Sequence, residues 1–185
     1  MFSRKDVAFL TATALLGIIS YITGLDYYLA STISNRAAHG VSLFFSFQYY
    51  VAFMVLSTLI MLVKNRRAAV SMVVSVTLVF LIQGMFTEFA PRARPSEAML
   101  IGAGLMHLIQ SSGTSSSFFS GHTASSMVVY VTYMMAGHHP AAMLVLAAPI
   151  MASRIMLVQH YLSDVLGGII FGYVTAKVAY TLVVR

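Results

Sequence analysis

The sequence predicts an all-α integral membrane protein, in which residues 1–185 form a single domain built as a bundle of six transmembrane helices. Composition is the first observation: hydrophobic residues make up 59% of the chain and charged residues 9%, whereas soluble domains carry roughly a quarter charged residues. The second is a mean hydropathy of +0.85. The third is that the apolar residues fall into segments long enough to cross a bilayer, with no strand-like alternation among them.

Six apolar segments predict the six helices. They cover 7–25, 43–63, 68–87, 120–137, 141–157 and 164–184, and a membrane helix needs about 20 mainly apolar residues. The first segment is too long for the apolar part of a signal peptide and no cleavage site follows it, so we expect a retained helix. The fourth and fifth are short and contain Ser, Thr or Pro, but a backbone inside lipid has few alternatives to a helix.

The longest connection between predicted helices spans 88–119. A semi-apolar stretch at 97–110 could lie on the membrane surface. The Ser- and Gly-rich run at 111–117 is typical of a flexible loop. A connection of this length in so small a domain is usually functional or disordered.

The basic residues predict a topology with both termini in the cytoplasm. That orientation places seven basic residues at or near the inner side and four outside. The inner set is Arg4, Lys5, Lys64, Arg66, Arg67, Lys177 and Arg185, and the outer set is Arg36, Arg92, Arg94 and Arg154. The expected location is a bacterial inner membrane. The net charge of +6 does not indicate nucleic acid, because the basic residues are scattered beside apolar runs.

Polar and ionisable residues stand beside four ends of the predicted helices. They follow the third helix, open the fourth, close the fifth and open the sixth, and in a six-helix topology these ends share one face of the membrane. With the expected orientation that face is the periplasmic one. The residues are Arg94-Pro95, Ser120-Gly121-His122, Ser153-Arg154, and His160 with Asp164.

These residue types suit the binding of a phosphate group. A phosphate monoester carries nearly two negative charges, and arginine side chains can hold it with paired hydrogen bonds. Gly121 would let the backbone approach an oxyanion closely. The start of the fourth helix would offer free N–H groups and the positive end of a helix dipole.

The two histidines suit phosphoryl transfer. His160 and Asp164 are i, i+4 on one helix face, so the carboxylate could accept a hydrogen bond from one ring nitrogen and orient the other. The imidazole could then act as a nucleophile, while His122 donates a proton to the leaving oxygen. No cofactor and no metal are needed, and the chain has no Cys, which excludes a thiol nucleophile.

The same residues resemble the signatures of the type 2 phosphatidic acid phosphatase (PAP2) superfamily over roughly 87–172. Ser153-Arg154 with His160 and Asp164 resembles the third signature. Phe119-Ser120-Gly121-His122 resembles the second, Pro-Ser-Gly-His, with Phe in place of Pro. Arg94-Pro95 resembles the end of the first, Lys-x6-Arg-Pro, and Thr87 stands where that signature has Lys.

The resemblance implies a six-helix fold and a role for each matching residue. His160 would be the nucleophile, Asp164 its orienting partner and His122 the general acid. The phosphate would be bound by Arg94, Ser120, Gly121 and Arg154. With Thr87 in place of Lys, one contact is left open, and Arg92 could supply the charge. His107, in the long connection, is a further possible site residue, and Glu88 should point away from a phosphate or pair with an arginine.

The expected function is hydrolysis of a phosphorylated lipid within the bilayer. Candidate substrates are phosphatidate, phosphatidylglycerophosphate, polyprenyl pyrophosphate and lipid A phosphates. One alternative is a lipid phosphotransferase or sphingolipid-synthase-like transferase that uses the same phosphohistidine. Another is a non-catalytic transporter or scaffold for anionic lipids. The sequence leaves the oligomeric state open, and it predicts an interfacial position for Asp26 and helix packing for Gly168 and Gly172.

Overall fold

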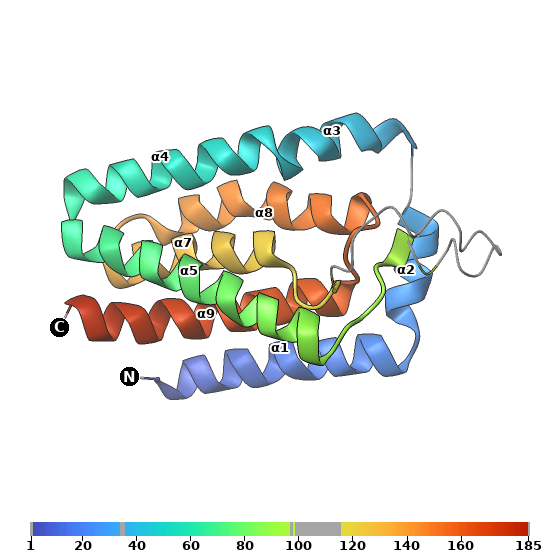
Figure 1. The fold of residues 1–185 in the computed structure, drawn as a ribbon. Coiled ribbons are helices and arrows are strands. Elements are labelled where there is room, and N and C mark those ends of the chain that lie inside the picture. Colours follow the sequence, from blue (N-terminus) through green and yellow to red (C-terminus); the bar gives the residue numbers. More distant parts are fainter. Residues whose placement is uncertain (1, 34–35, 97, 99–115, 185) are drawn as a thin grey trace.

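The computed structural model describes residues 2–33, 36–96, 98 and 116–184. All regular secondary structure in these ranges is α-helical. The long helices run roughly along one axis, and α2 lies across one end of the bundle (Figure 1). The helices are α1 (Arg4–Ile22), α2 (Leu25–Ile33), α3 (Arg36–Ser46), α4 (Gln48–Lys64), α5 (Arg66–Phe89), α7 (Gly121–Met135), α8 (Pro140–Met156) and α9 (Leu162–Val184).

The all-helical membrane class predicted from the sequence is confirmed, although the number of spans is not. Five of the six predicted segments each correspond to one helix, and the segment 43–63 spans the end of α3 and most of α4. Four stretches are long and apolar enough to cross a membrane, namely Arg4–Ile22, Gly40–Lys64, Arg66–Phe89 and Leu162–Val184. Helix α8 is apolar but shorter, and α7 has only 15 residues, four of which are buried Ser or Thr. Because α7 is surrounded by other helices, its surface does not need to be apolar, and six spans stay a prediction.

The first outer connection differs most from the prediction. The predicted first helix reaches residue 25, but α1 ends at Ile22, and Gly24 then adopts a positive φ of 74°. Helix α2 follows in a region predicted to be a loop. The next helical stretch begins at Arg36, seven residues before the predicted start at 43, and α3 and α4 meet at Phe47. The predicted surface stretch at 97–110 lies outside the described residues, apart from Ala98.

Helices α7 and α9 pack closely at the centre of the bundle. A Cβ on Gly172 would lie 2.2 Å from the carbonyl oxygen of Ala124, and one on Gly168 would lie 2.7 Å from the carbonyl oxygen of Ser120. Only glycine therefore allows α9 to approach the backbone of α7 so closely. This contact agrees with the predicted packing role of both glycines.

Helix α1 is attached to α9 by polar groups near the end of the bundle that holds both termini (Figure 1). Asp6 accepts hydrogen bonds from the Tyr173 hydroxyl and from the Lys177 ammonium group. Asp6 also forms a capping box with Ser3, which begins α1. Most large side chains of α1 face outward, so this ion pair gives the helix a specific attachment where lipid offers little hydrophobic drive.

Candidate functional site

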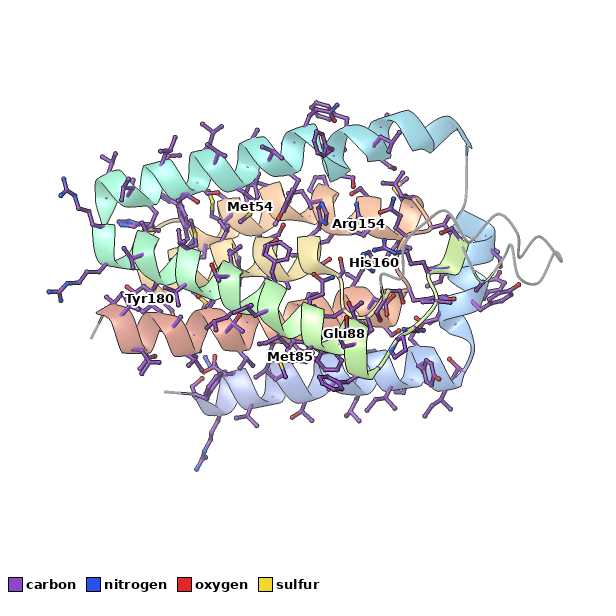
Figure 2. All side chains as sticks on the ribbon, in the orientation of Figure 1. Met54, Met85, Glu88, Arg154, His160 and Tyr180 are labelled. Atoms are coloured by element: carbon purple, nitrogen blue, oxygen red, sulfur yellow. The ribbon has the colours of Figure 1, made fainter. Side chains whose placement is uncertain are left out.

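The residues predicted to act together lie at the end of the bundle opposite the two termini. The end of α8 and the starts of α7 and α9 meet there (Figure 1). Figure 2 shows Arg154 and His160 near one another beside α2, with Tyr180 of α9 at the far end. His160, Arg154, Asp164 and Ser120 are all at most 4% exposed, so the site is a buried polar cluster.

The chain between Arg154 and His160 is held by backbone hydrogen bonds. The carbonyl of Arg154, near the end of α8, accepts from the N–H groups of Gln159 (3.3 Å) and His160 (3.2 Å). Val158 has a positive φ of 56°, an uncommon conformation for a β-branched residue. The tight return brings His160 back beside the end of α8, so the five-residue spacing of the motif corresponds to a defined turn.

His160 is oriented by a backbone carbonyl. Its Nδ1 lies 2.7 Å from the carbonyl oxygen of Ser117, and a carbonyl can only accept, so Nδ1 carries the proton. Nε2 then has a free lone pair. Burial lowers the pKa of His160 below its ordinary value, the charges of Arg154 and Arg94 lower it further, and Asp164 opposes them. The imidazole is therefore neutral near pH 7.

Asp164 lies farther from His160 than predicted. Its Oδ2 is 3.8 Å from Nδ1 of His160, which exceeds hydrogen-bond distance. The same oxygen accepts from the N–H of Tyr161 at 2.8 Å, where Asp164 acts as the reach-back carboxylate of the first turn of α9. The Asp164 carbonyl accepts from the N–H of Ser120 at 3.0 Å. Asp164 thus links the starts of α7 and α9, and Ser117 takes the hydrogen-bonding position expected for the carboxylate.

Arg154 brings a buried guanidinium group to the site. It donates to the Ser46 hydroxyl of α3 and to the Gln159 side chain. Its Nε is buried and has no hydrogen-bond partner within the part of the chain that the structure describes. A buried cation with an unused donor favours an anionic ligand, because an unmet donor costs free energy.

His122 lies on the first turn of α7, next to the same residues. Its ring lies 4.3 Å from the ring of Tyr50, centroid to centroid, and it hydrogen-bonds to the backbone of Ser46. It lies within electrostatic reach of Arg154 and His160. His122 thus reaches the cluster from a helix, whereas His160 reaches it from the turn before α9, which begins at Leu162, so His160 does not share a helix face with Asp164 as predicted.

Ser120 and Gly121 form the start of α7. The Ser120 hydroxyl accepts from the N–H of Thr123 at 3.4 Å and caps the helix. A Cβ on Gly121 would lie 2.5 Å from Oε1 of Gln83, so the missing side chain makes room for α5. Gln83 in turn donates to the Phe119 carbonyl at 2.9 Å. The glycine at this position therefore has a packing role, which the sequence reasoning did not foresee.

The remaining predicted residues occupy different environments. Arg94 is partly buried, and its charge reaches His160, His122 and Arg154. Thr87 donates to the Gln83 carbonyl on its own helix at 3.1 Å, and Glu88 is exposed. His107 lies outside the described residues.

Arg92 is bound to two carboxylates. Its guanidinium donates to Asp164 Oδ1 at 2.6 Å and to Asp26 Oδ2 at 3.0 Å. Asp26 is 4% exposed, so it is buried inside the protein, and its predicted interfacial depth stays a prediction. Hydrogen bonds from Ser163, Ser20 and Arg92 outweigh the effect of burial and lower the pKa of Asp26. Asp26 and Arg92 could have been singled out as ionisable residues beside apolar segments. Nothing in the sequence indicated that they form an ion pair.

In the ranges that the structure describes, no three His, Asp or Glu side chains gather closely enough to hold a metal ion.

Ser117 and Gln83 are two further residues of the cluster that the sequence did not indicate. Ser117 contributes its carbonyl oxygen, and every residue has one. Gln83 could have been singled out as a polar side chain within an apolar helix.

The fold and the cluster define an all-helical membrane protein whose buried ionisable side chains gather at one end of its bundle. The chain belongs to the PAP2 superfamily, whose family model matches residues 68–185. That match spans all the residues predicted for the site. No curated protein matches the sequence.

One solved structure has a similar fold. It is the crystal structure of a transmembrane PAP2 type phosphatidylglycerolphosphate phosphatase from Bacillus subtilis, with a TM-score of 0.67 and 19% sequence identity. The alignment covers 95% of this chain and 92% of that chain. At this identity the likeness establishes a common fold.

Proposed function

We propose that the protein is a membrane phosphatase that hydrolyses a lipid phosphate monoester or pyrophosphate through a phosphohistidine. The observation that carries the proposal is the state of His160. Its Nδ1 proton is donated to the Ser117 carbonyl at 2.7 Å, so Nε2 has a lone pair. Among the described residues none accepts from the buried Nε of Arg154, and a neutral imidazole beside a cation suits attack on a bound phosphate.

In the first step, the Nε2 lone pair of His160 forms a bond to phosphorus as the bond to the lipid oxygen breaks. The electron pair of the broken bond stays on the leaving oxygen, which takes a proton from protonated His122. Nδ1 keeps its proton and its hydrogen bond to Ser117. Arg154, Arg94 and the N–H groups at the start of α7 would stabilise the charge on the transferred group.

In the second step, His122 is neutral and takes a proton from a water molecule. The water oxygen bonds to phosphorus, the nitrogen–phosphorus bond breaks, and its electron pair returns to Nε2 of His160. Inorganic phosphate leaves and His122 is protonated again, so the catalyst is restored.

Family membership and an apolar helical bundle support a lipid substrate. The similar solved structure is titled as a phosphatidylglycerolphosphate phosphatase, which makes phosphatidylglycerophosphate the first substrate to test. Phosphatidate, polyprenyl pyrophosphate and lipid A phosphates complete the panel. We also propose that the site faces the periplasm of a bacterial inner membrane, because the basic residues favour the other side as cytoplasmic.

Phosphate release from this panel tests the proposal. The purified protein in detergent, with a chelator present, should release phosphate from at least one lipid. His160→Ala should abolish the release, because the nucleophile is lost. His122→Ala should slow it by about 10²- to 10⁴-fold, the usual contribution of a positioned general acid.

His138→Ala is the matched control, because His138 lies in the turn between α7 and α8 at the other end of the bundle. It should leave the rate unchanged. Full activity of His160→Ala would refute the proposed mechanism. Lipid turnover without free phosphate would instead identify a transferase that passes the phosphoryl group to a lipid acceptor.

A further inference from the structure

We infer that Arg92 and Asp26 are positioning residues for the phosphoryl-transfer site, because together they hold the charged carboxylate of Asp164 beside His160. This inference rests on the proposed function. The three side chains form one chain of contacts, Asp26–Arg92–Asp164, from α2 through the segment after α5 to the start of α9. Nη2 of Arg92 lies 3.0 Å from Asp26 Oδ2, and Nη1 lies 2.6 Å from Asp164 Oδ1.

Arg92 on Oδ1 and the N–H of Tyr161 on Oδ2 together fix which oxygen of Asp164 faces His160. Because Oδ1 is bound by Arg92, the carboxylate cannot rotate freely, and Oδ2 is left toward His160 at 3.8 Å from Nδ1. A carboxylate that is 0% exposed also needs a nearby cation to offset its charge. Arg92 therefore acts through Asp164.

Asp26 holds Arg92 in place. Its Oδ1 accepts from the Ser20 hydroxyl at 2.7 Å and from the Ser163 N–H at 2.9 Å. The Ser163 hydroxyl donates to Asp26 and accepts from Arg92 Nη1, the latter contact at 2.8 Å. The guanidinium also lies 4.1 Å from the ring centroid of Tyr161. Bidentate and stacking contacts of this kind require an arginine.

The backbone of Arg92 supports the same histidine by a second route. Its carbonyl accepts from the N–H of Ser117 at 2.8 Å, and the Ser117 carbonyl is the partner of His160 Nδ1. Both routes lead from Arg92 to His160. Substitution of Arg92 removes the guanidinium contact with Asp164, while the hydrogen bond from the Ser117 N–H to the backbone carbonyl at position 92 can remain.

This geometry argues against Arg92 as the replacement for the lysine that Thr87 lacks. Both terminal nitrogens of the guanidinium are engaged by carboxylates, so its charge is balanced before a phosphate arrives. A phosphate-binding arginine would instead keep donors available, as Arg154 does with its Nε in the part of the chain that the structure describes.

Single-turnover measurements can separate positioning from folding. The probe is radiolabelled short-chain phosphatidate, or the lipid hydrolysed fastest in the panel, mixed with excess protein in detergent. The rate constant reports the transfer step, and the amplitude reports the fraction of competent protein. Arg92→Gln should lower the rate constant by about 10- to 100-fold, the size of the loss seen when residues that hold metal ligands in place are substituted. The amplitude and the half-saturating lipid concentration should stay unchanged.

Companion variants test the connection between the two residues. Arg92→Lys should restore the rate only in part, because an ammonium group cannot span both carboxylates. Asp26→Asn should slow transfer less than Arg92→Gln. The double variant should be no slower than Arg92→Gln, because both changes disrupt one bridge. Arg67→Gln, an exposed arginine at the start of α5, is the matched control.

Three outcomes would overturn the inference. A wild-type rate constant in Arg92→Gln would show that the bridge has no effect. A reduced amplitude with an unchanged rate constant would assign it a purely structural role. A higher half-saturating concentration with an unchanged rate constant would make Arg92 a phosphate ligand. Failure of the proposed function is distinct, because the wild-type protein would then form no phosphohistidine at all.

Discussion

The position of one proton on His160 determines what chemistry the site can perform. The Ser117 carbonyl, 2.7 Å from Nδ1, selects the tautomer in which Nε2 is unprotonated. Burial favours the neutral ring. The Ser117 carbonyl thus orients the His160 ring, a role that the motif assigns to Asp164. Asp164 supplies a negative charge nearby.

The pKa of His160 gives the first prediction at this scale. Burial lowers it below the ordinary value of 6.5. A lowered pKa keeps the ring neutral, and therefore nucleophilic, as the pH falls through 6.5. NMR titration of ring-labelled histidine, assigned with His160→Gln, should give a midpoint below 6.5. A midpoint at or above 6.5 would contradict the role of burial.

The sequence predicted which side chains lie together in the buried cluster better than it predicted their contacts. Arg154, His160 and Asp164 stand at fixed short spacings, so a local pattern indicated them. The Asp26–Arg92 pair joins residues far apart in the sequence, and no spacing rule connects them. Ser117 could not be found from its residue type, because its contribution is a backbone carbonyl.

At the scale of helices, the close approach of α7 and α9 supports the site. Ser120 begins α7 and Asp164 belongs to the first turn of α9, and their backbones are joined by a hydrogen bond of 3.0 Å. Gly168 and Gly172 continue the contact farther along α9. A change in this packing would therefore shift both halves of the site relative to each other.

Substitution of Gly172 tests this packing. In Gly172→Ala the new Cβ would lie 2.2 Å from a backbone oxygen of Ala124, and a backbone atom cannot rotate away. We expect a loss of about 1–3 kcal/mol of stability, as for other overpacked interiors, measured by thermal unfolding in detergent.

Gly84→Ala is the matched control, because a Cβ on this glycine of α5 meets nothing within 4 Å. It should be neutral or stabilising, by up to about 1 kcal/mol, since alanine favours helix. Equal effects of the two substitutions would show that the α7–α9 contact is not tight.

The sequence predicted the long helices and missed the short ones. An apolar segment of about 20 residues is a strong signal, because only a helix satisfies the backbone in lipid. Helix α2 and the junction of α3 and α4 at Phe47 gave no such signal. Their boundaries depend on contacts with distant elements, such as the hydrogen bonds between Asp26 and Ser163.

At the scale of the whole molecule, both termini and the basic turn between α4 and α5 lie at one end, and the site lies at the other (Figure 1). The positive-inside rule predicts that the basic end is cytoplasmic. The absence of cysteine makes the chain a clean background for single-cysteine labelling of each end.

The two ends of α5 provide the pair of labelling sites. Phe89→Cys, at the site end and 83% exposed, should react with a membrane-impermeant maleimide in intact bacterial cells. Lys64→Cys, just before the other end of α5, should react only after the cells are permeabilised. The reverse pattern would show the opposite orientation, and labelling of both in intact cells would contradict a spanning α5.

The buried pair of Asp6 and Lys177 has a consequence for how the chain is assembled during synthesis. An ammonium group within a membrane helix is costly until it meets its counter-charge, and that counter-charge lies on the first helix, 171 positions earlier. Asp6 is near the start of α1, where water can hydrate it while the rest of the chain is made. The contact between Lys177 and Asp6 can therefore form only after α9 has been made, so α1 gains this polar attachment late in synthesis.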